Sequence, residues 1–124
     1  MDAKQRIRIV MIDPLLGTVE YALGGLQMRT DAIADNMANT NTPLYQAKRV
    51  AFEDSLSAAI RGGQPVPDAA PRVTNGLAIP DSQGNTVHLE TEMAEMTKTA
   101  LARQTLTSGF NYKVGLYKIA TGNK

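Results

Sequence analysis

The chain has 124 residues, with 13 basic and 12 acidic side chains and a formal net charge of +1. This length allows at most one domain of ordinary size. The near-neutral charge gives no case for a nucleic-acid or anionic-membrane partner, and the absence of cysteine excludes disulfides, thiol catalysis and thiolate metal sites.

Residues 1–13 are predicted to form a flexible leader. Three basic residues precede a short apolar run, as in the first part of a signal peptide. Asp13 ends this run well before the roughly seven to fifteen residues that a signal core needs. We therefore expect no cleaved signal, and no stretch approaches the roughly 18 apolar residues of a membrane span. Translation could begin at Met1 or at Met11, because recognisable pattern starts just after the latter.

A first long helix is predicted from Pro14 to Asn39, within an element that spans residues 14–42. Pro14 suits the first turn, where a missing N–H costs nothing. Apolar residues then recur at alternating steps of four and three, which is typical of a heptad seam. The seam consists of Ile12, Leu16, Val19, Leu23, Leu26, Thr30, Ile33 and Met37. At 1.5 Å per residue this helix would span roughly 39 Å, too long for a small globule to bury its stripe.

An unusual run of asparagines closes this helix. Asparagine tolerates the left-handed conformation and proline cannot continue a helix, so an ordinary helix end explains one asparagine and Pro43. It does not explain Asn36, Asn39 and Asn41 together. We treat the three asparagines, with Pro43 and Tyr45, as a candidate motif.

The middle segment, residues 43–87, holds five of the six prolines and is expected to contain a short helix and a loop. The helix is predicted over residues 47–60, with Phe52, Leu56 and Ile60 on one face and Gly62 just past its end.

The loop, residues 62–86, is expected to be extended and mobile unless a partner orders it. Within it, Asn75-Gly76 predicts a turn that joins residues 72–74 to residues 77–79 in a small hairpin.

A second long helix is predicted over residues 88–120, followed by a short tail, residues 121–124. Its seam has the same period and consists of Leu89, Met93, Met96, Ala100, Arg103, Thr107, Phe110, Val114 and Tyr117. Other apolar residues, such as Leu101 and Ile119, lie off the seam. This favours contacts with more than one neighbour over simple packing in a lone bundle, which predicts a single stripe.

The predicted fold class is therefore mainly α. The two long terminal helices are expected to pack as an antiparallel coiled-coil-like pair that forms one core domain. The middle is expected to add a short helix and a Pro/Gly-rich segment that is partly disordered or forms a small hairpin.

The sequence offers little reactive chemistry. His88 is the only histidine, and in an extended segment it would share a face with Glu90 and Glu92 and could ligate a metal. The favoured alternative is a helix start, where the two glutamates interact with the helix dipole. No glycine-rich phosphate loop is present, and no serine lies at a motif spacing from the histidine. We predict no enzyme activity, no metal, no cofactor and no small-molecule substrate.

Several segments resemble bacterial flagellar axial proteins. The run from Ala34 to Pro43, followed by Val50-Ala-Phe-Glu-Asp-Ser-Leu56, looks like the FlgB family of proximal rod subunits. Similar segments are Gly84–Val87, Glu92–Leu101 and Phe110–Ala120. The family usually has glycine where this chain has Leu44, and often Asp or Asn where it has His88.

The resemblance implies a structural subunit of the basal-body rod in the periplasmic space. It implies export by the flagellar type III apparatus without a cleaved signal, and polymerisation into the drive shaft for motility. The implied partners are copies of itself, the FlgC and FlgF rod subunits and the FliE adaptor, with no direct membrane insertion. The alternatives are another axial subunit such as FlgC, a free-standing helical adaptor or chaperone and, more distantly, a small metal-dependent enzyme.

Overall fold

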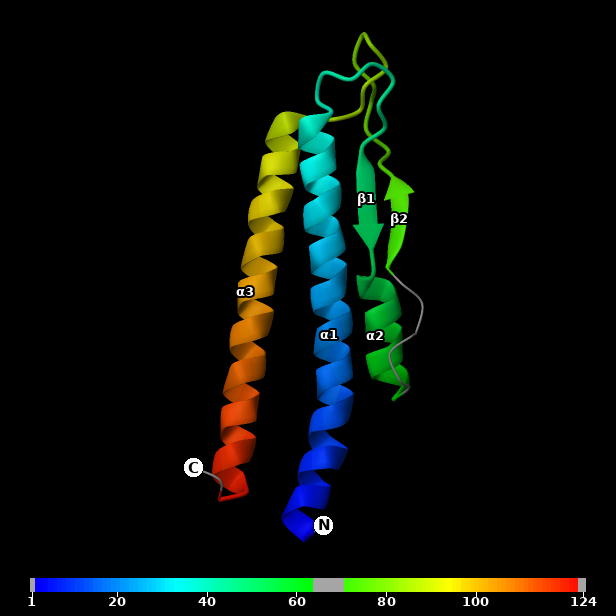
Figure 1. Cartoon of the computed structure of the whole chain (residues 1–124). Helices are drawn as coiled ribbons and strands as arrows, with labels where there is room; N and C mark the ends of the chain where they lie inside the picture. The colour runs from blue at the N-terminus through cyan, green and yellow to red at the C-terminus, as the bar shows by residue number, and fades with distance from the viewer. Residues whose placement is uncertain (1, 64–70, 123–124) are drawn as a thin grey trace.

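A computed structural model describes the backbone of residues 2–63 and 71–122, and their side chains except those of residues 7–13. Its elements are helix α1 (Ala3–Ala38), strand β1 (Lys48–Ala51), helix α2 (Glu53–Gly62), strand β2 (Arg72–Asn75) and helix α3 (Leu89–Ala120). Figure 1 shows α1 and α3 side by side and antiparallel, with the strands and α2 along the opposite side of α1. The mainly helical prediction is confirmed; coiled-coil packing between α1 and α3 stays a prediction.

Helix α1 is longer than the sequence pattern indicates. Asp2 caps its first turn in a capping box, since the Gln5 N–H donates to the Asp2 carboxylate (2.7 Å) and the Asp2 N–H donates to the Gln5 side chain (3.2 Å). The helix therefore begins at Ala3 and runs through Pro14, where we expected it to start. Of the residues expected to form a leader, 3–13 are helical and Met1 lies outside the described residues; the side chain of Ile12 also lies outside the described ones.

The apolar core lies where α1 meets β1 and the start of α2. Its buried members are Ala22, Leu26, Ala32, Val50 and Phe52, with Tyr21, Met28, Leu56 and Leu106 packed against them. The Tyr21 ring meets Phe52 edge-on with centroids 6.4 Å apart, and the Arg29 guanidinium lies 4.9 Å from the Phe52 centroid. Arg29 also pairs with Glu53 (2.6 Å). These contacts hold the first residue of α2 against α1.

The helix predicted over residues 47–60 is wrong in its first part. Residues 48–51 form β1, and α2 begins only at Glu53 and ends at Gly62, with Gly63 at a φ of 60° as its left-handed cap. The cause is a partner distant in the sequence, because β1 pairs antiparallel with β2. Local periodicity contains no information about that pairing.

The hairpin predicted around Asn75-Gly76 is also wrong. β2 pairs with β1, with Val73 opposite Val50, and the Gly76 N–H donates to the Ala47 carbonyl (2.7 Å). The expected second strand, residues 77–79, forms no strand. Pairing with β1 uses the backbone groups that a local hairpin would have required.

Helix α3 lies close to its predicted bounds but turns a different line of residues towards α1. Glu92 and Thr99 are buried, and Met96, Arg103 and Leu106 are half-buried. Four residues of the predicted seam are exposed: Leu89, Met93, Ala100 and Thr107. In the first half of α3, the residues buried against α1 are therefore Glu92 and Thr99, each one position before the predicted seam residues Met93 and Ala100. No described helix is both long enough and apolar enough to cross a membrane.

Candidate functional site: the Asn-rich turn and its polar cluster

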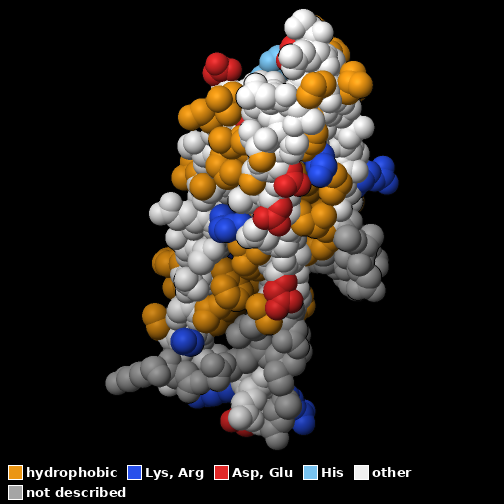
Figure 2. Space-filling model, turned by 45° about the horizontal axis from the view of Figure 1, so that its top comes forward, with side chains coloured by type: hydrophobic (Ala, Val, Ile, Leu, Met, Phe, Trp, Pro, Cys, Tyr) orange, Lys and Arg blue, Asp and Glu red, His pale blue; other side chains and the backbone are white. Residues whose placement is uncertain are grey.

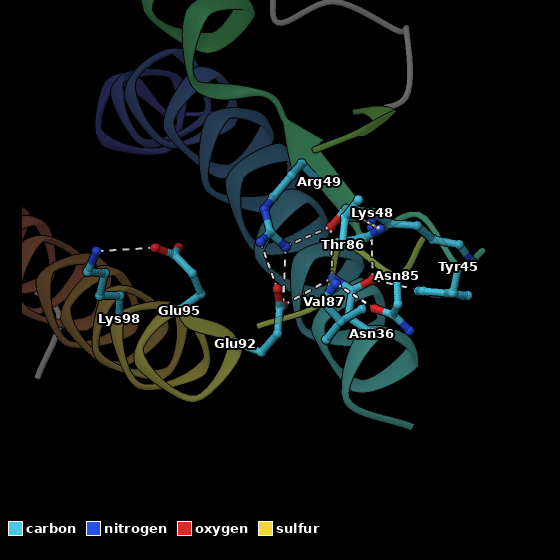
Figure 3. Close-up of polar contacts among 11 residues, drawn as sticks. Asn36, Tyr45, Lys48, Arg49, Asn85, Thr86, Val87, Glu92, Glu95 and Lys98 are labelled. Atoms are coloured by element: carbon cyan, nitrogen blue, oxygen red, sulfur yellow. Dashed lines mark hydrogen bonds and ion pairs between the residues drawn. The ribbon is translucent and has the colours of Figure 1, made fainter. Parts of the chain in front are cut away.

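A polar cluster of buried Asn36 and Glu92 and half-buried Arg49 joins α1, β1 and α3 (Figure 3). Glu92 is 0% exposed, and its carboxylate accepts two hydrogen bonds from the Arg49 guanidinium (2.7 and 3.1 Å). It accepts a third from the Asn36 amide (3.0 Å). Bidentate, charge-assisted contacts of this kind are strong and directional. The polar cluster therefore fixes how three elements meet at one point.

Asn36 also connects this cluster to the backbone of β1. Its amide donates to the Lys48 carbonyl (3.0 Å), and its side-chain oxygen accepts from the Lys48 N–H (2.8 Å) and the Tyr45 hydroxyl (3.4 Å). The side chain is 0% exposed, so these contacts replace water completely. The Asn36 side chain thus supplies the backbone hydrogen bonds that a neighbouring strand would otherwise give to Lys48 of β1.

Lys48 and Glu53 extend the charged contacts along the same side of α1. A hydrogen bond to Asp35 raises the pKa of Lys48, with further contributions from Tyr45 and from the Asp35 charge. Burial acts to raise the pKa of Glu53, but hydrogen bonds from Arg29 and from the backbone outweigh it, so this pKa is lowered. The Glu53 contacts therefore add stability above the ordinary carboxyl range, and that stability is lost as the pH falls through the lowered pKa.

A second asparagine, Asn85, closes the turn that follows α1. Its buried amide donates to the carbonyls of Asn39 (2.8 Å), Thr40 (3.1 Å) and Thr42 (2.8 Å), and its oxygen accepts from the Val87 N–H (2.7 Å). These contacts satisfy backbone carbonyls of the turn that follows α1. The start of α3 is thereby tied to the end of α1.

The neighbouring Thr86 ties the same segment to the chain leading into β1. Its hydroxyl accepts from the Ala47 N–H (2.8 Å), and its own N–H donates to the Tyr45 carbonyl (3.1 Å). Among the described residues, no buried side-chain nitrogen or oxygen lacks a partner. The region is thus a completed hydrogen-bond network, which is rigid and specific.

Some residues of the motif predicted from the sequence belong to this hydrogen-bond network, and others are exposed on the surface. Asn39 caps α1, with its amide on the Asp35 carbonyl (2.8 Å) and its oxygen accepting from the Thr42 hydroxyl (2.9 Å). Asn41 and Pro43 are exposed in the turn, and Tyr45 is half-buried against Asn36. Asn36 and Asn39 therefore have distinct structural roles, which explains why more than one asparagine is present.

The residues of the two predicted seams differ in burial. Val19, Leu26 and Ile33 are buried, Leu23, Met37, Met96, Phe110, Val114 and Tyr117 are half-buried, and Leu16 and Met93 are exposed. Of the residues predicted for the middle helix, Phe52 is in the core ahead of α2 and Leu56 packs against it from within α2. The role of these residues in assembly stays a prediction.

Sequence reasoning missed Arg49, included Asn85 and Thr86 only within the Gly84–Val87 segment that carries the resemblance, and interpreted Glu92 as a partner of the helix dipole. The sequence did contain an indication for Glu92. It lies on the same helix face as Met96 and Leu106, and a carboxylate on such an apolar face is buried only when it has a partner. Nothing in the local sequence marks Arg49 as its partner, since the two residues meet only after folding.

The structure places His88 at the N-cap of α3, exposed and without a side-chain capping bond. Glu92 points away from it towards Arg49. Within the part of the chain that the structure describes, no group of three His, Asp or Glu side chains could hold a metal ion. The residues of the site can order the backbone, but they offer no reactive arrangement.

Leu44 has a φ of 61°, the one positive value among the described residues other than glycine. This matches the position where the resemblance leads us to expect glycine. The Leu44 N–H donates to the Gln83 carbonyl (2.9 Å), and Gly84, itself at φ 75°, leaves space for the Leu44 side chain. A left-handed conformation costs a residue with a Cβ atom about 1–2 kcal/mol.

We therefore expect Leu44→Gly to raise the free energy of unfolding by about 0.5–1 kcal/mol, because it removes this strain but adds freedom to the unfolded chain. Leu44 is 77% exposed, so little apolar contact is lost. The matched control is Leu77→Gly, at a fully exposed leucine without a positive φ, and it should give no gain. Urea denaturation compares the two; equal effects would contradict the interpretation.

Two curated proteins are similar to this chain, and both are named Flagellar basal body rod protein FlgB. The protein from Aeromonas hydrophila is 27% identical over 130 residues, covering 93% of this chain and 98% of its own length. The protein from Bacillus subtilis (strain 168) is 29% identical over 119 residues, covering 86% of this chain and 92% of its own length. No family model matches the chain.

Proposed function

Because the chain is similar to FlgB rod proteins along most of its length, which confirms the resemblance expected from the sequence, we propose that it is a structural subunit of the proximal flagellar rod. The observation that carries the proposal is this similarity, which covers 93% and 86% of the chain and 98% and 92% of the two relatives. The geometry agrees with it, since the contacts of the described site order backbone rather than bind a substrate.

A structural role also accounts for the outer face of α3. Figure 2 shows hydrophobic side chains gathered along the flank that α3 forms. The exposed apolar residues of this helix are Leu89, Met93, Leu101, Tyr112, Leu116 and Ile119. Apolar patches on a protein surface commonly mark interaction sites. We propose that copies of the chain and related rod subunits cover it.

The finer parts of the proposal come from the resemblance. The chain would leave the cytoplasm through the flagellar type III apparatus without a cleaved signal, and it would polymerise into the drive shaft that spans the periplasm. FliE, FlgC and FlgF would be its neighbours. A contact between different faces of successive copies does not close on itself, and it generates a helical polymer.

Coupled folding and assembly would follow from the distribution of burial. The buried side chains of the described residues lie in residues 19–59 and 85–99, near the turn. Among the described side chains, none before Val19 in α1 and none after Thr99 in α3 is buried, so these distal parts gain little from pairing with each other. We propose that neighbouring subunits complete the packing of these distal parts.

The decisive experiment is electron microscopy of basal bodies from a strain that lacks the gene, with a complemented control. Membrane rings without a rod, restored by complementation, are the expected result. Intact rods and hooks would contradict the proposal and favour a free-standing helical adaptor. A rod interrupted at a later position would favour another axial subunit such as FlgC.

We expect Leu101→Asp to abolish rod assembly and swimming while the purified chain keeps its helix content. Leu101 is 63% exposed on α3, so its replacement spares the core but places a charge in the proposed contact. Gln104→Asp, at an exposed polar position of the same helix, is the matched control and should swim. Normal motility of the Leu101 variant would contradict the proposed contact.

A substitution at Leu26 cannot separate assembly from folding. Leu26 is 5% exposed and belongs to the core, so a charge there would destabilise the chain before any polymer formed. A charge at Leu23, which is half-buried, would also destabilise the fold to some extent. The exposed face of α3 therefore provides the cleaner test.

A further inference from the structure

Helix α3 carries two overlapping lines of residues that could face α1. The packed line contains Glu92 and Thr99, whereas the next line contains Met93 and Ala100 at the corresponding positions. Both lines share Met96 and Phe110. Apolar burial alone favours the line with Met93 and Ala100, because a methionine is cheaper to bury than a carboxylate. The structure adopts the other line, with Glu92 at 0% and Met93 at 55% exposure.

The polar cluster of Asn36, Arg49 and Glu92 explains this choice. Glu92 reaches its three hydrogen bonds only when its side of α3 faces α1 and β1. Turning α3 towards the Met93 line would move the carboxylate away from Arg49 and leave Asn36 without one of its acceptors. Figure 3 shows how both partners converge on Glu92 from the other two elements.

We propose that the polar cluster determines which face of α3 packs inward, and so which apolar residues the molecule presents to its surroundings. Asn36, Arg49 and Glu92 are positioning residues in this sense. The consequence is that Leu89 and Met93 stay outside, on the exposed part of α3. This inference concerns the orientation of one helix, and it holds whether or not the chain is a rod subunit.

The energetics of buried ion pairs indicate that the polar cluster selects the face of α3 that packs inward rather than adding net stability to the fold. Burying an ion pair has a desolvation cost that the attraction between the two charges offsets only in part. Replacing such a pair with well-packed apolar residues is therefore often neutral or stabilising. Buried polar residues are known to fix register in helical assemblies at some cost in stability. The cluster matches that situation, since Asn36 and Glu92 are buried and no buried side-chain nitrogen or oxygen of the described residues lacks a partner.

The test replaces the whole cluster with apolar residues: Asn36→Leu, Arg49→Met and Glu92→Met in one full-length chain. The chain contains no cysteine, so a single introduced thiol reports one position without interference. Reporters are Met93→Cys on the exposed line, Thr99→Cys on the packed line (3% exposed), and Ala22→Cys in the core (6% exposed). Each is introduced separately into the parent and the triple variant, and its rate of reaction with a small water-soluble thiol reagent is measured.

In the parent we expect fast reaction at position 93 and slow reaction at positions 99 and 22. In the triple variant we expect the rate at 93 to fall and the rate at 99 to rise, each several-fold, while 22 stays slow. The matched control, Glu95→Met with Lys98→Met, removes an exposed ion pair of the same helix and should keep the parent pattern.

Two outcomes would overturn the proposal. A folded triple variant with the parent pattern would show that α3 keeps its orientation without the cluster. A fast reaction at position 22 would show that the variant unfolds, which would mean that the cluster supplies stability rather than the choice of face.

Discussion

Replacing Arg49 alone with methionine is expected to lower the free energy of unfolding by about 3–5 kcal/mol. The substitution removes two of the three hydrogen bonds to Glu92 and leaves a carboxylate with 0% exposure without its counter-charge. Asn36 remains as a donor, but a neutral amide cannot balance a buried charge. Urea denaturation followed by circular dichroism gives the loss directly.

The matched control is Lys98→Met, which removes the cationic partner of another glutamate on α3. The Lys98–Glu95 pair is 3.2 Å long with side chains 73% and 36% exposed, so the loss should stay below about 1 kcal/mol. Adding Glu92→Met to Arg49→Met should recover much of the stability, because no buried charge is then left unpaired. Equal losses for the Arg49 and Lys98 variants would contradict the account of the cluster.

The second large effect is expected from Gly25→Ala, which should lower the free energy of unfolding by about 3 kcal/mol. A Cβ atom at this position would lie 2.5 Å from two atoms of the Phe52 ring and 2.8 Å from a third. The ring is buried and contacts Tyr21 and Arg29, so moving it would disturb both contacts. Thermal or urea unfolding of the purified chain measures the loss.

The adjacent Gly24 provides the control, because it is exposed and a Cβ atom there meets nothing within 4 Å. Gly24→Ala should raise the free energy of unfolding by up to about 1 kcal/mol through helix propensity alone. The two variants differ by one position on the same helix, so opposite signs isolate the contact with Phe52. A gain in both variants would show that α1 and Phe52 separate easily.

Much of the helical architecture could be predicted from the sequence. Apolar residues at steps of three and four marked both long helices, and the end of α1 near Asn39 followed from the asparagines and Pro43. The start of α1 was missed because a capping box at Asp2 outweighs the presence of a proline within the helix. The start of α1 is set by the capping box at Asp2, and the apolar seam pattern begins only later in the helix, at Ile12.

The parts that could not be predicted depend on contacts between distant residues. β1 forms because residues 72–75 pair with it, and the helical period around Phe52 hides that outcome. The orientation of α3 depends on Arg49, which lies 43 positions before Glu92. The motif residues were found through the resemblance, and only the folded chain distinguishes Asn36, in the network, from the exposed Asn41.

The antiparallel arrangement has a consequence for the timing of biosynthesis. α1 begins and α3 ends at the same end of the molecule, so the first helix to be translated packs beside the last (Figure 1). Asn36 and the network around it lack Asn85, Thr86 and Glu92 until most of the chain has been translated. Contacts this distant in sequence form late and slowly. A nascent chain on the ribosome can therefore complete this polar network only when translation is almost finished.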